Sequence, residues 1–123
     1  MEQETELKVI LKSKELNKYT IQKTDSSKFP KKYTFTFRVR LQNKSMDIYE
    51  MLMDANRTNL NTNGKRRIEL QSRVINECDK FSYYIELLLD FKIITDKSAA
   101  YWSKLVSDVK YMTIAWRTRD KER

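Results

Sequence analysis

The segment WSKLVSDVKYMTIAW, residues 102–116, carries the clearest structural signal in the sequence. Its apolar side chains recur at alternating steps of three and four residues, which is the spacing of one buried stripe on a packed α-helix. The stripe consists of Trp102, Leu105, Val109, Met112 and Trp116. Upstream, Thr95 or Asp96 offers a side-chain oxygen that can cap the first turn. The segment therefore predicts an amphipathic helix over residues 97–119.

Three further helices are predicted before it. Polar or helix-breaking clusters at 24–32, 60–64 and 94–98 separate them, and the first two clusters hold the only proline and the only glycine. The predicted helices cover residues 5–23, 34–59, 65–93 and 97–119. The third repeats the buried stripe with Val74, Cys78, Phe81, Ile85 and Leu88. One glycine and one proline are too few for the many turns of a β-rich fold.

Short joints between long helices make neighbouring helices antiparallel. The sequence therefore predicts an all-α, antiparallel up-down-up-down four-helix bundle. A length of 123 residues suits one domain, so we expect a single domain over 1–123 with frayed tails at 1–5 and 120–123.

Several cellular settings are disfavoured by composition. No apolar run approaches the roughly twenty residues of a membrane span, and residues 1–6 are acidic, unlike a secretory signal. A single cysteine, Cys78, excludes an internal disulfide and suits a reducing compartment. We expect a cytoplasmic protein that does not bind membranes.

The predicted helix 34–59 has apolar residues on two opposite sides. At about 100° per residue, one side holds the core stripe Phe37, Leu41, Ile48, Leu52 and Ala55. The opposite side holds Phe35, Val39, Met46 and Met53. A helix at the corner of a lone bundle buries one side only, so something else should cover the second stripe. We expect a second copy of the chain there; the alternative is that the first helix or the 24–33 segment folds over it.

The same helix carries three carboxylates in a third sector, Asp47, Glu50 and Asp54. Metal sites in helical bundles normally add histidines, and this chain has none. A solvated face, or ion pairs with a neighbour's lysines, is the better interpretation. Without histidine, a glycine-rich loop or an exposed cysteine, the usual catalytic arrangements are also missing. We expect a protein that is not an enzyme and holds no metal or cofactor.

Positive charge gathers at both ends of the predicted bundle. Twenty-five Lys and Arg against seventeen Asp and Glu give a formal net charge of +8, which favours a polyanionic partner. The topology brings together two sets of candidate phosphate-binding residues. The first is Arg57, Lys65, Arg66, Arg67, Arg117 and Arg119, and the second is Lys31, Lys32, Arg38 and Arg40. Phe29 and Tyr33 lie near these clusters and are candidates for stacking on unpaired bases. Trp116 also lies near them, but its place in the apolar stripe makes a core position the better interpretation.

Three segments resemble a known family. They are KFPKKYTFTFRVRLQN (28–43), MDIYEMLMDANR (46–57) and ITDKSAAYWSKLVSDVKYMTIAWR (94–117). The chain from about residue 7 to 119 resembles the accessory variability determinant family of diversity-generating retroelements. That family looks related to four-helix-bundle proteins encoded by intervening sequences in bacterial large-subunit rRNA genes. The resemblance implies a basic bundle that forms a pentameric ring, binds RNA and DNA, and associates with reverse transcriptase during mutagenic cDNA synthesis.

These observations converge on one functional prediction. We expect a non-catalytic, oligomeric bundle that binds RNA or DNA through its basic surface as the partner of a reverse transcriptase. Two main alternatives are a free-standing bundle of the rRNA intervening-sequence type and a scaffold whose basic face binds an acidic protein. An enzyme that uses Asp47, Glu50 and Asp54 around a metal, and an antitoxin-like or membrane-surface role, also remain open at this stage.

Overall fold

The computed structural model describes the backbone of residues 2–123 and the side chains of residues 8–123. A 3₁₀ turn and a five-residue π-helical turn, Thr34–Arg38, precede the second of the long helices. The long helices are α1 (Glu2–Thr24), α2 (Val39–Arg57), α3 (Leu60–Asp90) and α4 (Asp96–Lys121). The prediction of an all-α fold is confirmed.

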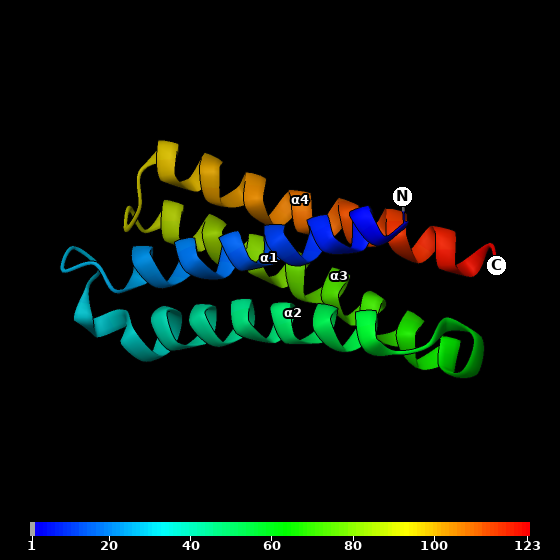
Figure 1. Cartoon of the computed structure of the whole chain (residues 1–123). Helices are drawn as coiled ribbons and strands as arrows, with labels where there is room; N and C mark the ends of the chain where they lie inside the picture. The colour runs from blue at the N-terminus through cyan, green and yellow to red at the C-terminus, as the bar shows by residue number, and fades with distance from the viewer. Residues whose placement is uncertain (1) are drawn as a thin grey trace.

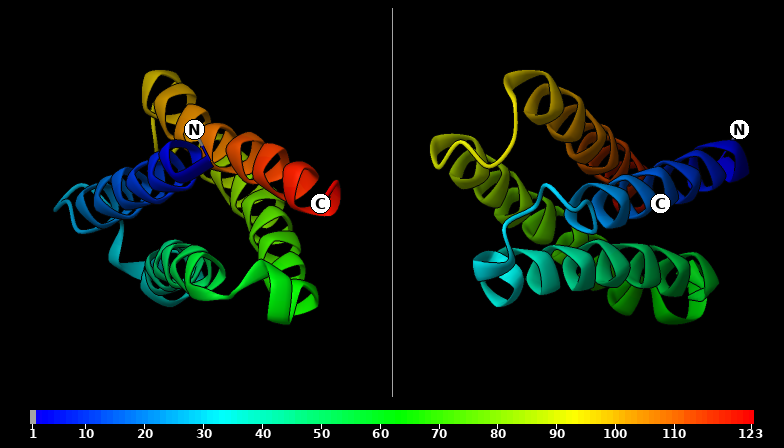
Figure 2. Two further views of the ribbon diagram at one scale, coloured as in Figure 1. Left: turned by 45° about the vertical axis from the view of Figure 1, so that its right-hand side comes forward. Right: turned by 90° about the vertical axis from the view of Figure 1, so that its left-hand side faces the viewer.

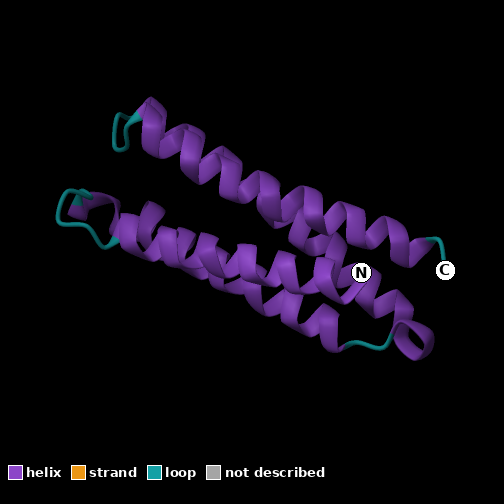
Figure 3. Ribbon diagram, turned by 45° about the horizontal axis from the view of Figure 1, so that its top comes forward, coloured by secondary structure: helices purple, strands orange, loops and turns teal. Residues whose placement is uncertain are grey.

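The helices form an antiparallel bundle. Consecutive helices pack against each other and α1 also packs against α4, so that each helix occupies one corner. The chain termini and the α2–α3 connection lie at one end, which we call the proximal end (Figure 1). The α1–α2 and α3–α4 connections lie at the opposite, distal end. Two further views show the loops confined to these ends (Figure 2; Figure 3). The predicted up-down-up-down topology is confirmed.

The predicted apolar stripes of α2, α3 and α4 fill the core. Trp102 and Trp116 of α4 are buried, whereas Met112 is only half-buried. Trp102 packs edge-on against Tyr19 and Phe81, and its Nε1 donates a hydrogen bond to Thr20 Oγ1 at 3.0 Å. The fully buried partners from the other stripes include Leu41, Ile48, Leu52, Val74, Cys78 and Leu88.

The first helix buries hydroxyls as well as apolar side chains. Val9, Ile10 and Leu16 face the core beside Ser13, Thr20 and Thr24. The hydroxyls of Ser13 and Thr24 donate to backbone carbonyls of the same helix at 2.7 Å, so their burial does not leave a donor unsatisfied.

The helix boundaries differ from the prediction at the proximal end of the bundle. The α2–α3 joint is Thr58–Asn59 rather than 60–64, because the Asn59 side chain accepts from the first backbone amides of α3 and starts the helix early. A non-helical residue, Asn63 (φ −147°, ψ 43°), kinks that first turn. At the chain ends, α1 begins at Glu2 and α4 continues through a buried Asp120 to Lys121.

Candidate nucleic-acid interface

A cationic groove lies on the outer side of α3 at the proximal end. It has a volume of about 530 Å³ and is lined by Lys65, Arg66, Ile68, Glu69, Ser72 and Arg73. Arg117 of α4 reaches its edge, where Nη1 donates a hydrogen bond to Ser72 Oγ at 3.2 Å. The lining includes one carboxylate, Glu69, which lies 3.9 Å from Arg66. Both side chains of this pair are about half exposed, so it neutralises little of the charge. We call this site, with Arg117, the α3 groove.

Arg67 lies outside the α3 groove and points into the bundle. Its side chain is 9% exposed, and Nε lies 2.8 Å from Asp120 Oδ2. The guanidinium sits 4.9 Å from the ring centre of Trp116, and Gln71 Nε2 donates to the same Asp120 carboxylate at 2.7 Å. Position 67 precedes the buried Val74 by seven residues and therefore shares its side of α3. The prediction that Arg67 belongs to an exposed phosphate-binding cluster is wrong.

The other proximal candidates do not form one cluster. Arg57 is exposed at the end of α2, at the same end of the bundle as the α3 groove. Arg119 follows Arg117 by two residues, which places it about 200° further around α4. That side of α4 faces α1, as Met112 seven residues earlier shows by lining a groove with α1 residues. Arg117 and Arg119 therefore serve different surfaces.

One of the distal candidates, Arg40, lines an aromatic groove. Lys31 and Lys32 are exposed in the turn before α2. Arg40 donates to the Tyr84 hydroxyl at 3.3 Å and lines a groove of about 500 Å³ with Phe35, Thr36, Phe37, Tyr84, Leu87 and Phe91. Arg38 is half-buried, with its guanidinium 5.8 Å from the ring centre of Phe29. Of the four distal candidates, Lys31, Lys32 and Arg40 are exposed.

The aromatic rings available to a nucleic acid differ from those that the sequence suggests. Phe29 and Trp116 are buried and Tyr33 is half-buried. Phe35 and Phe91, in contrast, are 82% and 57% exposed. Exposed rings beside cations can stack on unpaired bases, so these two replace the earlier candidates.

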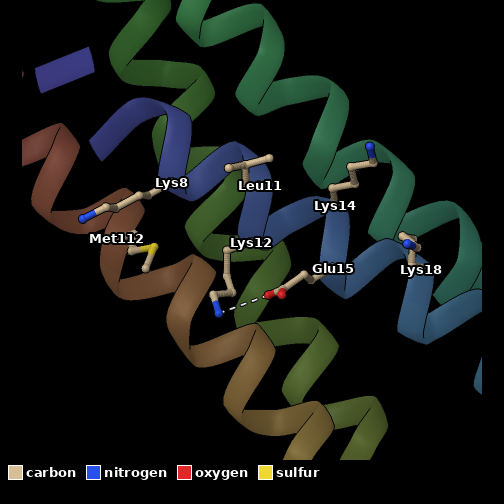
Figure 4. A pocket seen from close by; sticks show the side chains of 7 residues that line it. All are labelled: Lys8, Leu11, Lys12, Lys14, Glu15, Lys18 and Met112. Atoms are coloured by element: carbon tan, nitrogen blue, oxygen red, sulfur yellow. Dashed lines mark ion pairs between the residues drawn. The ribbon is translucent and has the colours of Figure 1, made fainter. Parts of the chain in front are cut away.

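A second basic groove, between α1 and α4, was not anticipated from the sequence. It has a volume of about 610 Å³ and is lined by Lys8, Leu11, Lys12, Lys14, Glu15, Lys18 and Met112. Lys12 pairs with Glu15 at 3.1 Å and also approaches Asp108 of α4 at 3.7 Å. Figure 4 shows the remaining lysines set around Leu11 along α1. Lys14 and Lys18 are four residues apart and share a side of the helix, which is the signal that could have found this α1 groove.

The second stripe of the α2 segment is largely uncovered. Phe35, Met46 and Val39 are 82%, 43% and 38% exposed, whereas Met53 is half-buried against the core. The carboxylates of the same outer face, Asp47, Glu50 and Asp54, are all exposed and make no ion pair with another described residue. Apolar and acidic side chains therefore share one surface, which we call the α2 face.

Metal ligands do not gather in the described part of the chain. Among residues with described side chains, no three of the His, Cys, Asp or Glu type come close enough to hold a metal ion. Asp47, Glu50 and Asp54 do not come together in such a group. In the same part of the chain, none of the helices combines the length and the apolar character needed to cross a bilayer.

Cys78 illustrates how closed the core is. The thiol is fully buried, and burial raises its pKa to about 12. Because the reactive species is the thiolate, we expect Cys78 to react with an aromatic disulfide reagent at pH 8 roughly a thousandfold more slowly in the native protein than in guanidinium chloride. Absorbance of the released thiol measures both rates. Equal rates would contradict the closed core.

Comparison of the chain with protein-family models, with curated proteins and with solved structures finds no match in any of the three.

Proposed function

We propose that this chain binds RNA or DNA without sequence preference, through phosphate contacts made by the α3 groove. The observation that carries the proposal is the meeting of Lys65, Arg66, Arg73 and Arg117, from two helices, around the single carboxylate of Glu69. Lysine and arginine contact phosphates through charge-assisted hydrogen bonds. Each contact releases condensed counterions, which makes the affinity fall steeply with salt concentration.

The distal end extends the proposed contact to unpaired bases. Lys31, Lys32 and Arg40 would hold the phosphates of a single strand while Phe35 or Phe91 stacks on a base. Stacking tolerates any base, and phosphate contacts carry no sequence information. The protein would therefore bind template and product strands alike.

The proposed role of this binding is to assist a reverse transcriptase. The oligomeric bundle would hold template RNA or its cDNA product near the polymerase and perform no chemistry itself. Support for this partner comes from the resemblance of residues 28–57 and 94–117 to retroelement accessory proteins. Co-purification of the chain with the product of a neighbouring reverse transcriptase gene tests the association, and its failure would remove this part of the proposal.

Replacing Lys65 and Arg66 together by alanine should weaken binding to oligonucleotides of unrelated sequence to the same degree. Two lost phosphate contacts should lower the affinity by roughly tenfold or more near 0.1 M salt, and should reduce the slope of log K against log salt by about 0.9 per contact. Fluorescence anisotropy of labelled RNA and DNA across a salt series measures both quantities.

The matched control replaces Lys97 and Lys104, which are exposed on the distal half of α4, by alanine. It removes the same charge and should leave the slope nearly unchanged. Equal losses in the two double variants would mean that net charge, rather than the α3 groove, determines binding. Unchanged affinity and slope in the Lys65, Arg66 variant would exclude the groove as the site.

A further inference from the structure

The α1 groove and the α2 face have opposite charge. Lys8, Lys14 and Lys18 are exposed on α1 and make no ion pair with another described residue, since the acid among them, Glu15, is taken by Lys12. Leu11 lies at their centre and is 52% exposed (Figure 4). The α2 face presents Asp47, Glu50 and Asp54 beside exposed methionine and valine. Each surface is an apolar strip flanked by unpaired charges of one sign.

The two surfaces also match in height along the bundle. Asn17 of α1 bonds Ser45 of α2, and Thr24 bonds Gln42, so these pairs mark common levels. Both helices rise equally per residue and run in opposite directions. Counting from the two markers places Lys18 level with residues 44–48 of α2, and Lys14 level with residues 48–52.

Continuing the count places the remaining members of the two surfaces opposite one another. Lys8 is level with residues from 54 onward, where Asp54 stands, and Leu11 is level with residues 51–55, which include Met53. A rotation about an axis parallel to the bundle keeps every residue at its own level. Under such a rotation Lys18 meets Asp47 of a second copy, and Lys14 meets Glu50.

We propose that the α1 groove of one copy binds the α2 face of the next, with Lys8, Lys14 and Lys18 facing Asp54, Glu50 and Asp47, and Leu11 packing against Met53. The inference rests on the self-association expected in the proposed function and specifies which surfaces make it. Because different surfaces meet, each copy carries one surface of each kind and can bind two neighbours.

The positions of α1 and α2 in the bundle favour closure into a ring. They occupy adjacent corners, so their outer faces point roughly a quarter turn apart. A head-to-tail contact between faces at that angle turns each copy by roughly a quarter turn relative to the last, so a rotation about an axis parallel to the bundle closes a ring after about four copies.

A polyanion is the competing occupant of the α1 groove, and the apolar centre argues against it. Phosphates pair with lysine and gain nothing from contact with Leu11 or Met112. A second copy supplies both the carboxylates and the methionine side chains that such a strip accommodates. The two occupants are separated by measuring particle mass and oligonucleotide affinity on the same variants.

Charge reversal on each surface tests the contact. The α1 variant carries Lys14→Glu and Lys18→Glu, and the α2 variant carries Asp47→Lys and Glu50→Lys. By light scattering at micromolar concentration, we expect the wild type to exceed the monomer mass of 14.9 kDa and each variant to fall to it. An equimolar mixture of the two variants should again exceed the monomer mass, because the native surface that each retains complements that of the other, and the two reversed surfaces complement each other as well. A chain carrying all four substitutions should assemble again through the reversed charges.

The control is Lys28→Glu with Lys97→Glu, two exposed residues at the distal end, which should keep the wild-type mass. A monomeric wild type, a single-face variant that keeps the wild-type mass, or a mixture that stays monomeric would each overturn the inference. An α1 variant that keeps the wild-type mass but loses affinity for the oligonucleotide would also overturn the inference. That result would still agree with the proposed nucleic-acid binding. If the particle masses change with the charge reversals as expected, but neither the wild type nor any variant binds oligonucleotide, the contact between copies is supported and nucleic-acid binding is refuted.

Discussion

Replacing Asp120 by alanine is expected to lower the free energy of unfolding by about 3–5 kcal/mol. The Asp120 side chain is 1% exposed and accepts hydrogen bonds from Arg67 Nε at 2.8 Å and from Gln71 Nε2 at 2.7 Å. Without the carboxylate, the Arg67 guanidinium stays in the bundle as an uncompensated charge, and Gln71 loses its acceptor. Urea denaturation followed by circular dichroism measures the loss.

Two companion variants define the cause. Replacing both partners, Arg67→Met with Asp120→Leu, should recover the part of the loss that comes from the unpaired Arg67 charge, because the desolvation cost of a buried pair nearly offsets its attraction. Gln71 still lacks its acceptor in this variant, so about 1–3 kcal/mol of the loss should remain. Glu69→Ala removes an acid from an exposed pair on the same helix and should change stability by less than about 0.5 kcal/mol. An Asp120→Ala variant as stable as Glu69→Ala would show that Arg67 escapes to solvent without cost.

Trp102→Ala should destabilise the protein by about 3–5 kcal/mol. Trp102 is 0% exposed and packs between Tyr19 of α1 and Phe81 of α3. Its removal leaves a cavity where three helices meet, and Thr20 loses the indole donor. The same urea titration measures the change.

Trp102→Phe is the matched control. Phenylalanine keeps an aromatic ring in the core and lacks only part of the volume and the Nε1 donor, so the variant should lose substantially less stability than alanine does. Equal losses for the two variants would mean that the hydrogen bond to Thr20, and not packing, dominates at this position.

The fold follows from sequence periodicity because burial repeats regularly along each helix. The stripe of α3 from Val74 to Leu88 and the α4 tryptophans are buried as predicted. The joints are less predictable, since asparagine and glycine signal a turn and a helix start equally well. Asn59 caps α3, and Gly64, whose φ is not positive, lies within the helix. The short segment LNTNG therefore reads as a loop in the sequence and forms the first turns of α3.

The candidate site can be predicted from the sequence only in part. Composition reveals how many cations a chain has but not which of them face inward. The spacing of Arg67 from Val74 indicates that Arg67 lies on the core side of α3. Its partner, Asp120, lies 53 residues away in the sequence, so no local pattern predicts the pair. The α1 lysines give a weaker sequence signal because they are spread along a helix, whereas the cations at 31–32 and 65–67 are consecutive in the sequence. The proposed pairing of the α1 and α2 surfaces depends on which residues of the two helices lie at the same height along the bundle. Only the three-dimensional structure gives these heights.

The hydroxyl-lined inner side of α1 has a mechanical consequence. With Ser13, Thr20 and Thr24 at core positions, this helix removes less apolar surface from water than a leucine stripe would, so it is the segment that a partial opening of the bundle would release first. A neighbouring subunit clamped onto its outer lysines would restrain that release. Association would then stabilise α1, the least firmly packed helix of each protomer. Assembly of the oligomer would therefore also raise the stability of the individual fold.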